Sequence, residues 1–199
     1  MIRIGLTGGI GSGKSVVASL LQTYGIPIYI ADQESKKLLQ TSPAIREQLI
    51  TLLGNSIYEE NRLNRQRMAS LIFNDAKLLK KVNNIIHPQV ASHFNTWAKR
   101  QNTEFTVLES AILFESGFTQ YVDISLMVYA PMELRIKRTV IRDNTTETEV
   151  LQRIKNQLPD EEKKEYADYI INNDDNQALI PQTQKILASL SGEYNSGKV

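Results

Sequence analysis

Short apolar runs recur along the chain, separated by longer stretches in which apolar positions follow a helical spacing. Runs this short, bounded by turn residues, are typical of buried strands. Strands that alternate with helices favour a parallel sheet covered by helices. The predicted strands cover residues 2–6, 26–31, 106–108, 124–129 and 169–171. We therefore expect an α/β fold, with further helices at 16–21, 33–40 and 177–190.

The pattern between about 41 and 102 differs, because it contains amphipathic helical pieces and no strand. Ser42-Pro43 marks a helix start, with a capping residue before Pro at the first helical position. Pro88 is expected to break or restart a helix near His87. The repeated apolar stripe predicts core packing rather than a cofactor site. The expected organisation is a single kinase-like domain with core segments 1–40 and 103–190, a helical insertion at about 41–102 and a tail at 191–199.

Residues 8–15 read GGIGSGKS and fit the phosphate-loop pattern G-x-x-x-x-G-K-[ST]. Gly8 and Gly13 allow backbone conformations that a Cβ would forbid, so that successive N–H groups can face phosphate oxygens. Lys14 can reach the outer phosphates and the Ser15 hydroxyl can ligate Mg²⁺. A strand before the loop and a helix after it support this interpretation. A dinucleotide fingerprint fails, since it would need Gly where Lys14 stands.

Composition and charge exclude several other classes of protein. The 199 residues carry a formal net charge of +1, which does not indicate a general nucleic-acid or anionic-membrane surface. The chain has no Cys and two His, which excludes a disulfide framework and leaves too few ligands for a zinc site. No signal peptide and no membrane-length apolar run is present, so a cytoplasmic protein is expected.

Two carboxylates follow predicted strands. Asp32 comes after the strand at 26–31, and Glu109 comes after the strand at 106–108. In a parallel sheet these positions share an edge with the phosphate loop, where ligands of open α/β sheets bind. Asp32 is also a candidate N-cap for the helix at 33–40, and the position alone favours neither role. His87, at the Pro88 corner, is a weaker candidate, since a lone His is usually structural.

A basic helix follows Pro131. Arg135, Arg138 and Arg142 are spaced by three and four residues, which places them on one helix face. A solvated basic surface is one interpretation. The helix leads into the polar turn 143–146 and a second basic helix, so a lid at about 138–160 that closes over ATP is the favoured one.

Several motifs together resemble the dephospho-coenzyme A kinase family over nearly the whole chain. The phosphate loop is shared with many kinases, and the other motifs are more specific. They are Ala31-Asp32, Ile86-His87-Pro88 with Val90, Leu113-Phe114-Glu115, Arg138-x-x-x-Arg142-Asp143, Arg153-Ile154-x-x-Gln157 and Ala167-Asp168-Tyr169-Ile170-Ile171-x-Asn173.

The resemblance implies a P-loop nucleotide-kinase-like three-layer fold and transfer of the γ-phosphoryl group of ATP to the 3′-hydroxyl of dephospho-CoA. It implies ATP and dephospho-CoA as partners, Mg²⁺ as the metal, and no nucleic acid, membrane or obligatory protein partner. Lys14, Asp32 and Arg142 are the implied catalytic residues. Ser15 and, through water, Glu109 are the implied metal contacts. The implied ATP-binding residues are Gly9, Ile10, Gly11, Ser12, Gly13, Lys14, Ser15, Val16, Arg138, Arg142 and Asn173. The implied substrate-binding residues are Asp32, His87, Glu109, Leu113 and Phe114.

The chain departs from the family pattern at three positions. Ile30 stands where an Asp is usual, Glu109 replaces an Asp, and Asn172 lies where an Asp is frequent. Asp32 is therefore left without its usual acidic neighbour. Two rival functions stay open: another P-loop small-molecule kinase, and a non-catalytic ATP-binding switch. A GTPase switch is disfavoured because the chain has no Asn-Lys-x-Asp base-reading motif.

Overall fold

The computed structural model describes residues 1–60, 62–73 and 75–196. Two compact units divide the chain: Met1–Tyr29 with the segment from Gln101 onward, and Ile30–Arg100. The second unit begins earlier than the insertion expected at about 41, because the helix after the second strand groups with it. Among the described residues, no helix is both long enough and apolar enough to cross a membrane.

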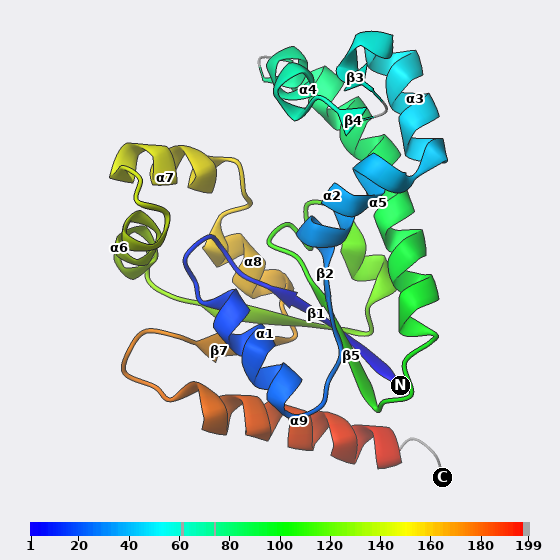
Figure 1. The fold of residues 1–199 in the computed structure, drawn as a ribbon. Coiled ribbons are helices and arrows are strands. Elements are labelled where there is room, and N and C mark those ends of the chain that lie inside the picture. The colour runs from blue at the N-terminus through cyan, green and yellow to red at the C-terminus, as the bar shows by residue number, and fades with distance from the viewer. Residues whose placement is uncertain (61, 74, 197–199) are drawn as a thin grey trace. The chain divides into compact units, whose positions relative to one another are not determined.

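A parallel sheet forms the centre of the first unit, as predicted (Figure 1). Its strand order is β2-β5-β1-β6-β7, in which β1 pairs in parallel with β5 and β6, and β6 with β7. All five predicted strands are confirmed, with ends shifted by up to two residues. The strands are β1 (Ile2–Thr7), β2 (Ile28–Ile30), β5 (Phe105–Glu109), β6 (Ile124–Tyr129) and β7 (Tyr169–Asn172).

Helices pack on this sheet through alternate strand residues. Ile4 and Leu6 of β1 are fully buried in a cluster with α1 (Lys14–Thr23) and α9 (Leu179–Ser196). Gly5, between them, points the other way, toward the Leu113 side chain. Successive residues of a strand face opposite sides of the sheet, so β1 is covered on both faces. The helix expected to end at residue 190 continues to Ser196, so the tail predicted from 191 is helical through that residue, and 197–199 lie outside the described residues.

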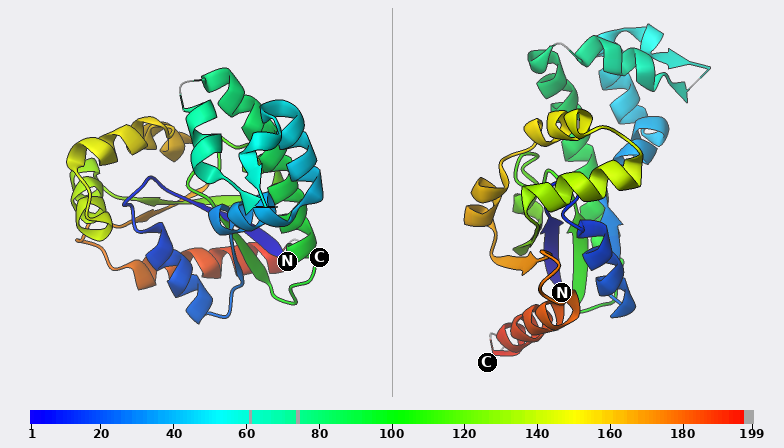
Figure 2. Two further views of the ribbon diagram at one scale, coloured as in Figure 1. Left: turned by 45° about the horizontal axis from the view of Figure 1, so that its top comes forward. Right: turned by 90° about the vertical axis from the view of Figure 1, so that its left-hand side faces the viewer.

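The α6–α7 helical hairpin carries the basic residues. It comprises α6 (Met132–Asp143) and α7 (Glu147–Lys155), which lie side by side in both views of Figure 2. Asn144 takes a left-handed conformation that ends α6, and Thr146 caps α7. Residues 156–159 then connect α7 to α8 (Asp160–Tyr166), which packs on β6. A 3-10 helix, η2 (Phe118–Tyr121), precedes β6.

The second unit is mainly helical. It contains α2 (Ala31–Thr41), α3 (Pro43–Leu53), α4 (Arg65–Ile72) and α5 (Ala76–Ala98), with the 3-10 helix η1 (Asn55–Ile57). Ser42 caps α3 by accepting the Ile45 N–H at 3.3 Å, as its sequence predicts. The region at about 41–102, expected to contain no strand, instead holds a short antiparallel pair, β3 (Tyr58–Glu59) and β4 (Arg62–Leu63).

The break predicted at Pro88 is wrong, since α5 is continuous from Ala76 to Ala98. Pro88 removes one N–H donor from the helix. Val82 and Ile86 before it and Val90 and Phe94 after it are nevertheless buried. Packing of this shared apolar face holds both halves in one helix, and so overrides the local preference.

Candidate active site

The phosphate loop spans residues 8–13, between β1 and α1. Gly13 is the N-cap of α1, in a left-handed conformation with φ of 92°, and no side chain caps the helix. The Gly13 carbonyl accepts the N–H groups of Val16 and Val17. The first amides of α1 therefore form a helix start that is open to an anion, where the helix dipole also favours negative charge.

Close packing explains two of the loop glycines. A Cβ on Gly13 would collide with the Asn173 side-chain amide, and a left-handed conformation is already unfavourable for other residues. A Cβ on Gly9 would collide with the Arg135 guanidinium and approach the Asp160 carboxylate. The loop glycines thus admit neighbouring side chains as well as a ligand.

Lys14 and Glu109 form an ion pair at the edge of the sheet. Their Nζ and Oε1 atoms are 2.8 Å apart, and the side chains are only 16% and 13% exposed. The parallel register places Leu6 of β1 opposite Glu109 of β5, which brings the end of β5 beside the loop. The loop lysine is therefore held by a carboxylate that has little access to water.

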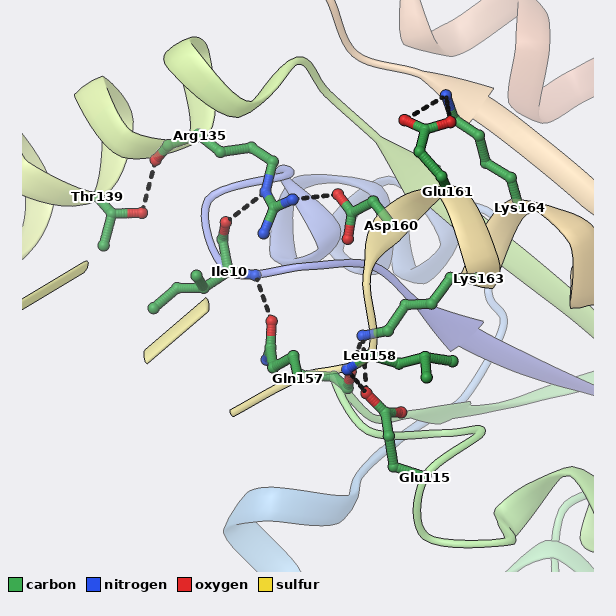
Figure 3. Close-up of polar contacts among 11 residues, drawn as sticks. Ile10, Glu115, Arg135, Thr139, Gln157, Leu158, Asp160, Glu161, Lys163 and Lys164 are labelled. Atoms are coloured by element: carbon green, nitrogen blue, oxygen red, sulfur yellow. Dashed lines mark hydrogen bonds and ion pairs between the residues drawn. The ribbon is translucent and has the colours of Figure 1, made fainter. Parts of the chain in front are cut away.

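Arg135 and Gln157 hold the loop at one residue, Ile10 (Figure 3). Arg135 Nε donates to the Ile10 carbonyl at 2.9 Å, and the Ile10 N–H donates to Gln157 Oε1 at 3.1 Å. Arg135 is buried and also pairs with Asp160. Burial raises the pKa of Asp160, and the Arg135 charge opposes that shift.

Asn173 holds the loop from the segment after β7, and Arg138 of α6 holds Asn173. Asn173 Nδ2 donates to the Ser12 carbonyl at 2.8 Å, and its backbone N–H donates to the Tyr129 carbonyl at 2.7 Å. Arg138 Nη1 donates to the Asn173 carbonyl at 3.0 Å and Arg138 pairs with Asp175. The structure thus brings the predicted residue Asn173 to the loop and the predicted residue Arg138 to Asn173.

Arg142 lies in different surroundings. Its side chain is 58% exposed, and its guanidinium donates to both carboxylate oxygens of Asp143, at 2.7 and 3.1 Å. Arg153 of α7 donates to the same carboxylate at 2.7 Å. The hydrogen bonds from the two arginines hold the pKa of Asp143 well below its usual range. Since Arg135 is buried and Arg142 is exposed, the interpretation of a uniformly solvated basic face is wrong.

The segment after β5 is packed against the core. Leu113 is fully buried and lies against Gly5, and the Phe114 ring is 5.7 Å from the Tyr166 ring. Glu115 Oε1 is 3.1 Å from Lys163 Nζ. For Leu113 this burial indicates a role in holding the segment. Direct contact of Leu113 and Phe114 with a substrate stays a prediction.

Asp32 and His87 belong to the second unit. The N-cap of α2 is Ile30, without a side-chain hydrogen bond, and exposed Asp32 lies in the first turn. The capping role considered for Asp32 is therefore wrong, although a carboxylate in the first turn still interacts favourably with the helix dipole. His87 lies inside α5, and burial lowers its pKa.

The sequence did not predict the contact of Gln157 with the loop, the pairing of Asp160 with Arg135 or the contact of Lys163 with the Ala111 carbonyl. Arg135 is part of the basic face of its helix, and Gln157 ends the motif Arg153-Ile154-x-x-Gln157. Neither pattern indicates a contact with Ile10. Asp160 and Lys163 lie in the run DEEKKE, which resembles a solvated helix face. Their burial depends on tertiary packing that local spacing does not encode.

The donor set fits a magnesium ion held largely by nucleotide phosphates. Ser15 is exposed in the uncapped first turn of α1, and Glu109 lies beside Lys14 at the adjacent strand end. Within residues 1–60, 62–73 and 75–196, no group of three or more His, Cys, Asp or Glu side chains could hold a metal. Mg²⁺ commonly uses one or two protein ligands together with substrate phosphates, which agrees with this arrangement.

Comparison with known proteins decides between the kinase families that share this loop. The family model described as dephospho-CoA kinase matches residues 2–178. The chain belongs to the dephospho-CoA kinase family. A dephospho-CoA kinase of Bacteroides fragilis is 47% identical over 190 residues, covering 95% of this chain and 93% of the relative. One from Porphyromonas gingivalis is 40% identical over 191 residues, covering 96% and 95%.

Solved structures confirm the P-loop kinase fold. A crystal structure from Thermus thermophilus has a TM-score of 0.81 and 32% identity, covering 96% of this chain and 97% of that one. Shikimate kinase from Acinetobacter baumannii has a TM-score of 0.52 and 19% identity, covering 97% and 94%, and is similar in fold alone. The predicted family and fold class are both confirmed.

Proposed function

We propose that this protein transfers the γ-phosphoryl group of ATP to the 3′-hydroxyl of dephospho-CoA, the last step of coenzyme A synthesis. The observation that carries the proposal is the open phosphate loop with its Lys14–Glu109 pair, in a chain that belongs to the dephospho-CoA kinase family. The protein is accordingly a transferase that uses ATP.

Phosphoryl transfer depends mainly on positioning and charge neutralisation. Amides of the loop and of the first turn of α1, other than the N–H groups of Ile10, Ser12 and Val16 that bond within the protein, hold the β- and γ-phosphates together with Lys14. Ser15 and, through water, Glu109 would hold Mg²⁺, which would supply positive charge that neutralises the phosphates. Asn173 completes the ATP site through its contact with the Ser12 carbonyl, and Arg138 contributes by binding the Asn173 carbonyl.

The acceptor side of the proposal rests on the second unit and on the lid. Asp32 orients the ribose hydroxyl and accepts its proton, and it is exposed at the start of α2 without a capping duty. His87, Leu113 and Phe114 shape the substrate site. Arg142 leaves Asp143 and closes over the transferring group, for which its exposed position in the hairpin is suitable.

A mass assay tests the activity directly. The protein is incubated with ATP, Mg²⁺ and dephospho-CoA, and we expect a product heavier by one phosphoryl group that co-elutes with CoA. Lys14→Met should lower its rate of formation by orders of magnitude while the circular dichroism spectrum is retained, because the substitution keeps length and removes charge.

The rival kinases are tested in the same assay. ADP release with shikimate or a nucleoside monophosphate as acceptor should stay at the acceptor-free background. Faster turnover with one of these acceptors than with dephospho-CoA would assign a different small-molecule kinase. ATP binding without transfer to any acceptor would favour a nucleotide-gated switch.

A further inference from the structure

Lys163 is a fully buried lysine that the proposed chemistry does not use. Its side chain is 0% exposed, within the short helix α8. Burying a charge costs several kcal/mol, and apolar replacements of buried ion pairs are often neutral or stabilising. Core packing alone therefore does not account for a lysine here, and its contacts suggest a positioning role.

Lys163 is bound to the segment that follows Glu109. Its Nζ donates to the Ala111 carbonyl at 2.9 Å and lies 3.1 Å from Glu115 Oε1. Ala111 is two residues from Glu109, the partner of Lys14. The ammonium therefore fixes the backbone beside the carboxylate that holds the loop lysine.

Glu115 extends the connection to residues 157–160, called here the lid base. Its Oε1 atom also accepts the Leu158 N–H at 2.8 Å. The preceding residue, Gln157, accepts the Ile10 N–H, and Asp160 pairs with Arg135, which donates to the Ile10 carbonyl. Figure 3 shows these contacts converging on one short stretch, residues 157–163.

We propose that Lys163 and Glu115 are positioning residues for phosphoryl transfer: they join the Glu109–Glu115 segment to the lid base and so set the phosphate loop at Ile10 and at Lys14. The inference deepens the proposed function and rests on it. Two structural routes lead from this pair to the loop, one through Gln157 and one through Glu109. Loss of the pair should therefore misplace Lys14 and the lid together.

The test compares Lys163→Met with Lys164→Met, the adjacent lysine of α8. Lys164 pairs with exposed Glu161 and lies over the Tyr129 ring, outside the network around Ile10. Misplacement of reacting groups by about 1 Å costs on the order of 100-fold. We expect Lys163→Met to lower kcat for CoA formation by roughly 10- to 100-fold, with a smaller change in the KM for ATP. Lys164→Met should stay near the wild-type rate.

Hydrogen exchange separates positioning from simple destabilisation. In Lys163→Met without substrates, amides of residues 8–15 and 110–117 should exchange several-fold faster, while those of β6 and α9 match the wild type. Loss of stability alone would raise exchange throughout the unit and leave kcat per folded molecule unchanged. That pattern, or a kcat for Lys163→Met equal to that of Lys164→Met, would overturn the proposal.

A second variant covers the case in which Lys163→Met does not fold. Glu115→Gln keeps an acceptor for the Leu158 N–H and removes the charge facing Lys163, with Glu161→Gln as its exposed control. We expect Glu115→Gln to reproduce the kcat loss and the faster exchange at residues 8–15; unchanged values contradict the role. The exchange measurement needs no acceptor, so absence of CoA formation by the wild type would count against the proposed function and leave the coupling separately testable.

Discussion

The backbone of Ile10 shows how few groups fix the phosphate loop. Arg135 donates to its carbonyl and Gln157 accepts from its N–H. Only backbone atoms are used, so the contacts constrain the path of the loop and not the residue type at position 10. Position 135, in contrast, requires an arginine-like charge, because Arg135 also neutralises the buried Asp160 carboxylate.

Replacing Arg135 should be costly. Arg135→Met leaves Asp160 buried without its partner, and breaking a buried pair typically costs about 3–5 kcal/mol. Urea denaturation measures the loss, with Arg153→Met as control, since exposed pairs contribute about 0–1 kcal/mol. Because burial raises the pKa of Asp160, the deficit should shrink as pH falls and that carboxylate becomes neutral. Equal losses in the two variants would show that the Arg135 pair is not special.

Asp32 makes a different prediction at the residue scale. It does not cap α2 and is exposed, so Asp32→Asn should change the free energy of unfolding by less than about 0.5 kcal/mol. If it orients the ribose hydroxyl, turnover should fall more than ATP affinity. Steady-state kinetics and nucleotide titration measure the two effects, and near-wild-type turnover would remove Asp32 from the proposed machinery.

The functional residues of the loop could be predicted from sequence, because the phosphate-loop pattern requires glycines, Lys14 and Ser15 at fixed positions. Lys163 could not, since only the fold shows that one lysine of a charged helix faces the Ala111 carbonyl while its neighbour Lys164 pairs at the surface. Glu109 lies between these cases: the strand end indicated a carboxylate at the edge, and the structure supplied its partner.

At the scale of elements, a capping box fixes the start of α7 in the basic hairpin. Thr146 Oγ1 accepts the Glu149 N–H at 3.3 Å, and Glu149 accepts the Thr146 N–H at 3.3 Å. This capping box satisfies two amides that the helix itself leaves without partners.

Removing the cap should loosen the hairpin locally. Thr146→Ala is expected to cost about 1 kcal/mol, because the Glu149 N–H loses its acceptor. Thermal unfolding followed by circular dichroism measures the loss, and Thr148→Ala, inside the same helix, is the matched control. A cost for Thr148→Ala as large as that for Thr146→Ala would argue against the capping box.

The hairpin also tests the proposed lid. Arg142→Ala removes an exposed side chain, so the fold should persist, while turnover falls because charge on the transferring group is no longer neutralised. Dephospho-CoA binding, measured by calorimetry, should change little, and Lys155→Ala provides an exposed control on α7. Failure of Arg142→Ala to fold would contradict the lid interpretation.

Elements were predictable where local rules agree with packing, as at Ser42 and at the strands of the sheet. They were not where packing overrides a local rule, as at Pro88 in the middle of α5. The pair β3 and β4 was missed because each strand is two residues long and shows no alternation.

At the scale of the whole molecule, His87 should contribute to the pH dependence of the free energy of unfolding. Burial lowers the pKa of His87, so the unfolded chain binds a proton more readily than the folded protein does. The contribution to stability is complete above the unfolded pKa of about 6.5 and is lost as pH falls through the folded value. Urea denaturation between pH 5 and 8 should show a decline on the acid side that is weaker in His87→Gln. An identical decline in both proteins would show that other groups govern it.

The overall α/β plan and the family could be predicted because strand runs and motif spacing are carried by the sequence itself. The sheet order β2-β5-β1-β6-β7 came only from the structure, since spacing does not specify which strands pair. The same holds for the boundary at Ile30, which depends on the unit with which α2 packs.

That sheet order has a consequence for synthesis of the chain. β1 emerges first from the ribosome, but its partners β5 and β6 follow only after the whole Ile30–Arg100 unit. At about 5–20 residues per second, roughly 5–20 s separate the emergence of β1 from that of β5. During this interval the apolar first strand has no neighbour, while the contiguous helical unit already has its full sequence. The nascent chain therefore acquires its nucleotide site late, and β1 stays an unpaired strand until β5 has been synthesised.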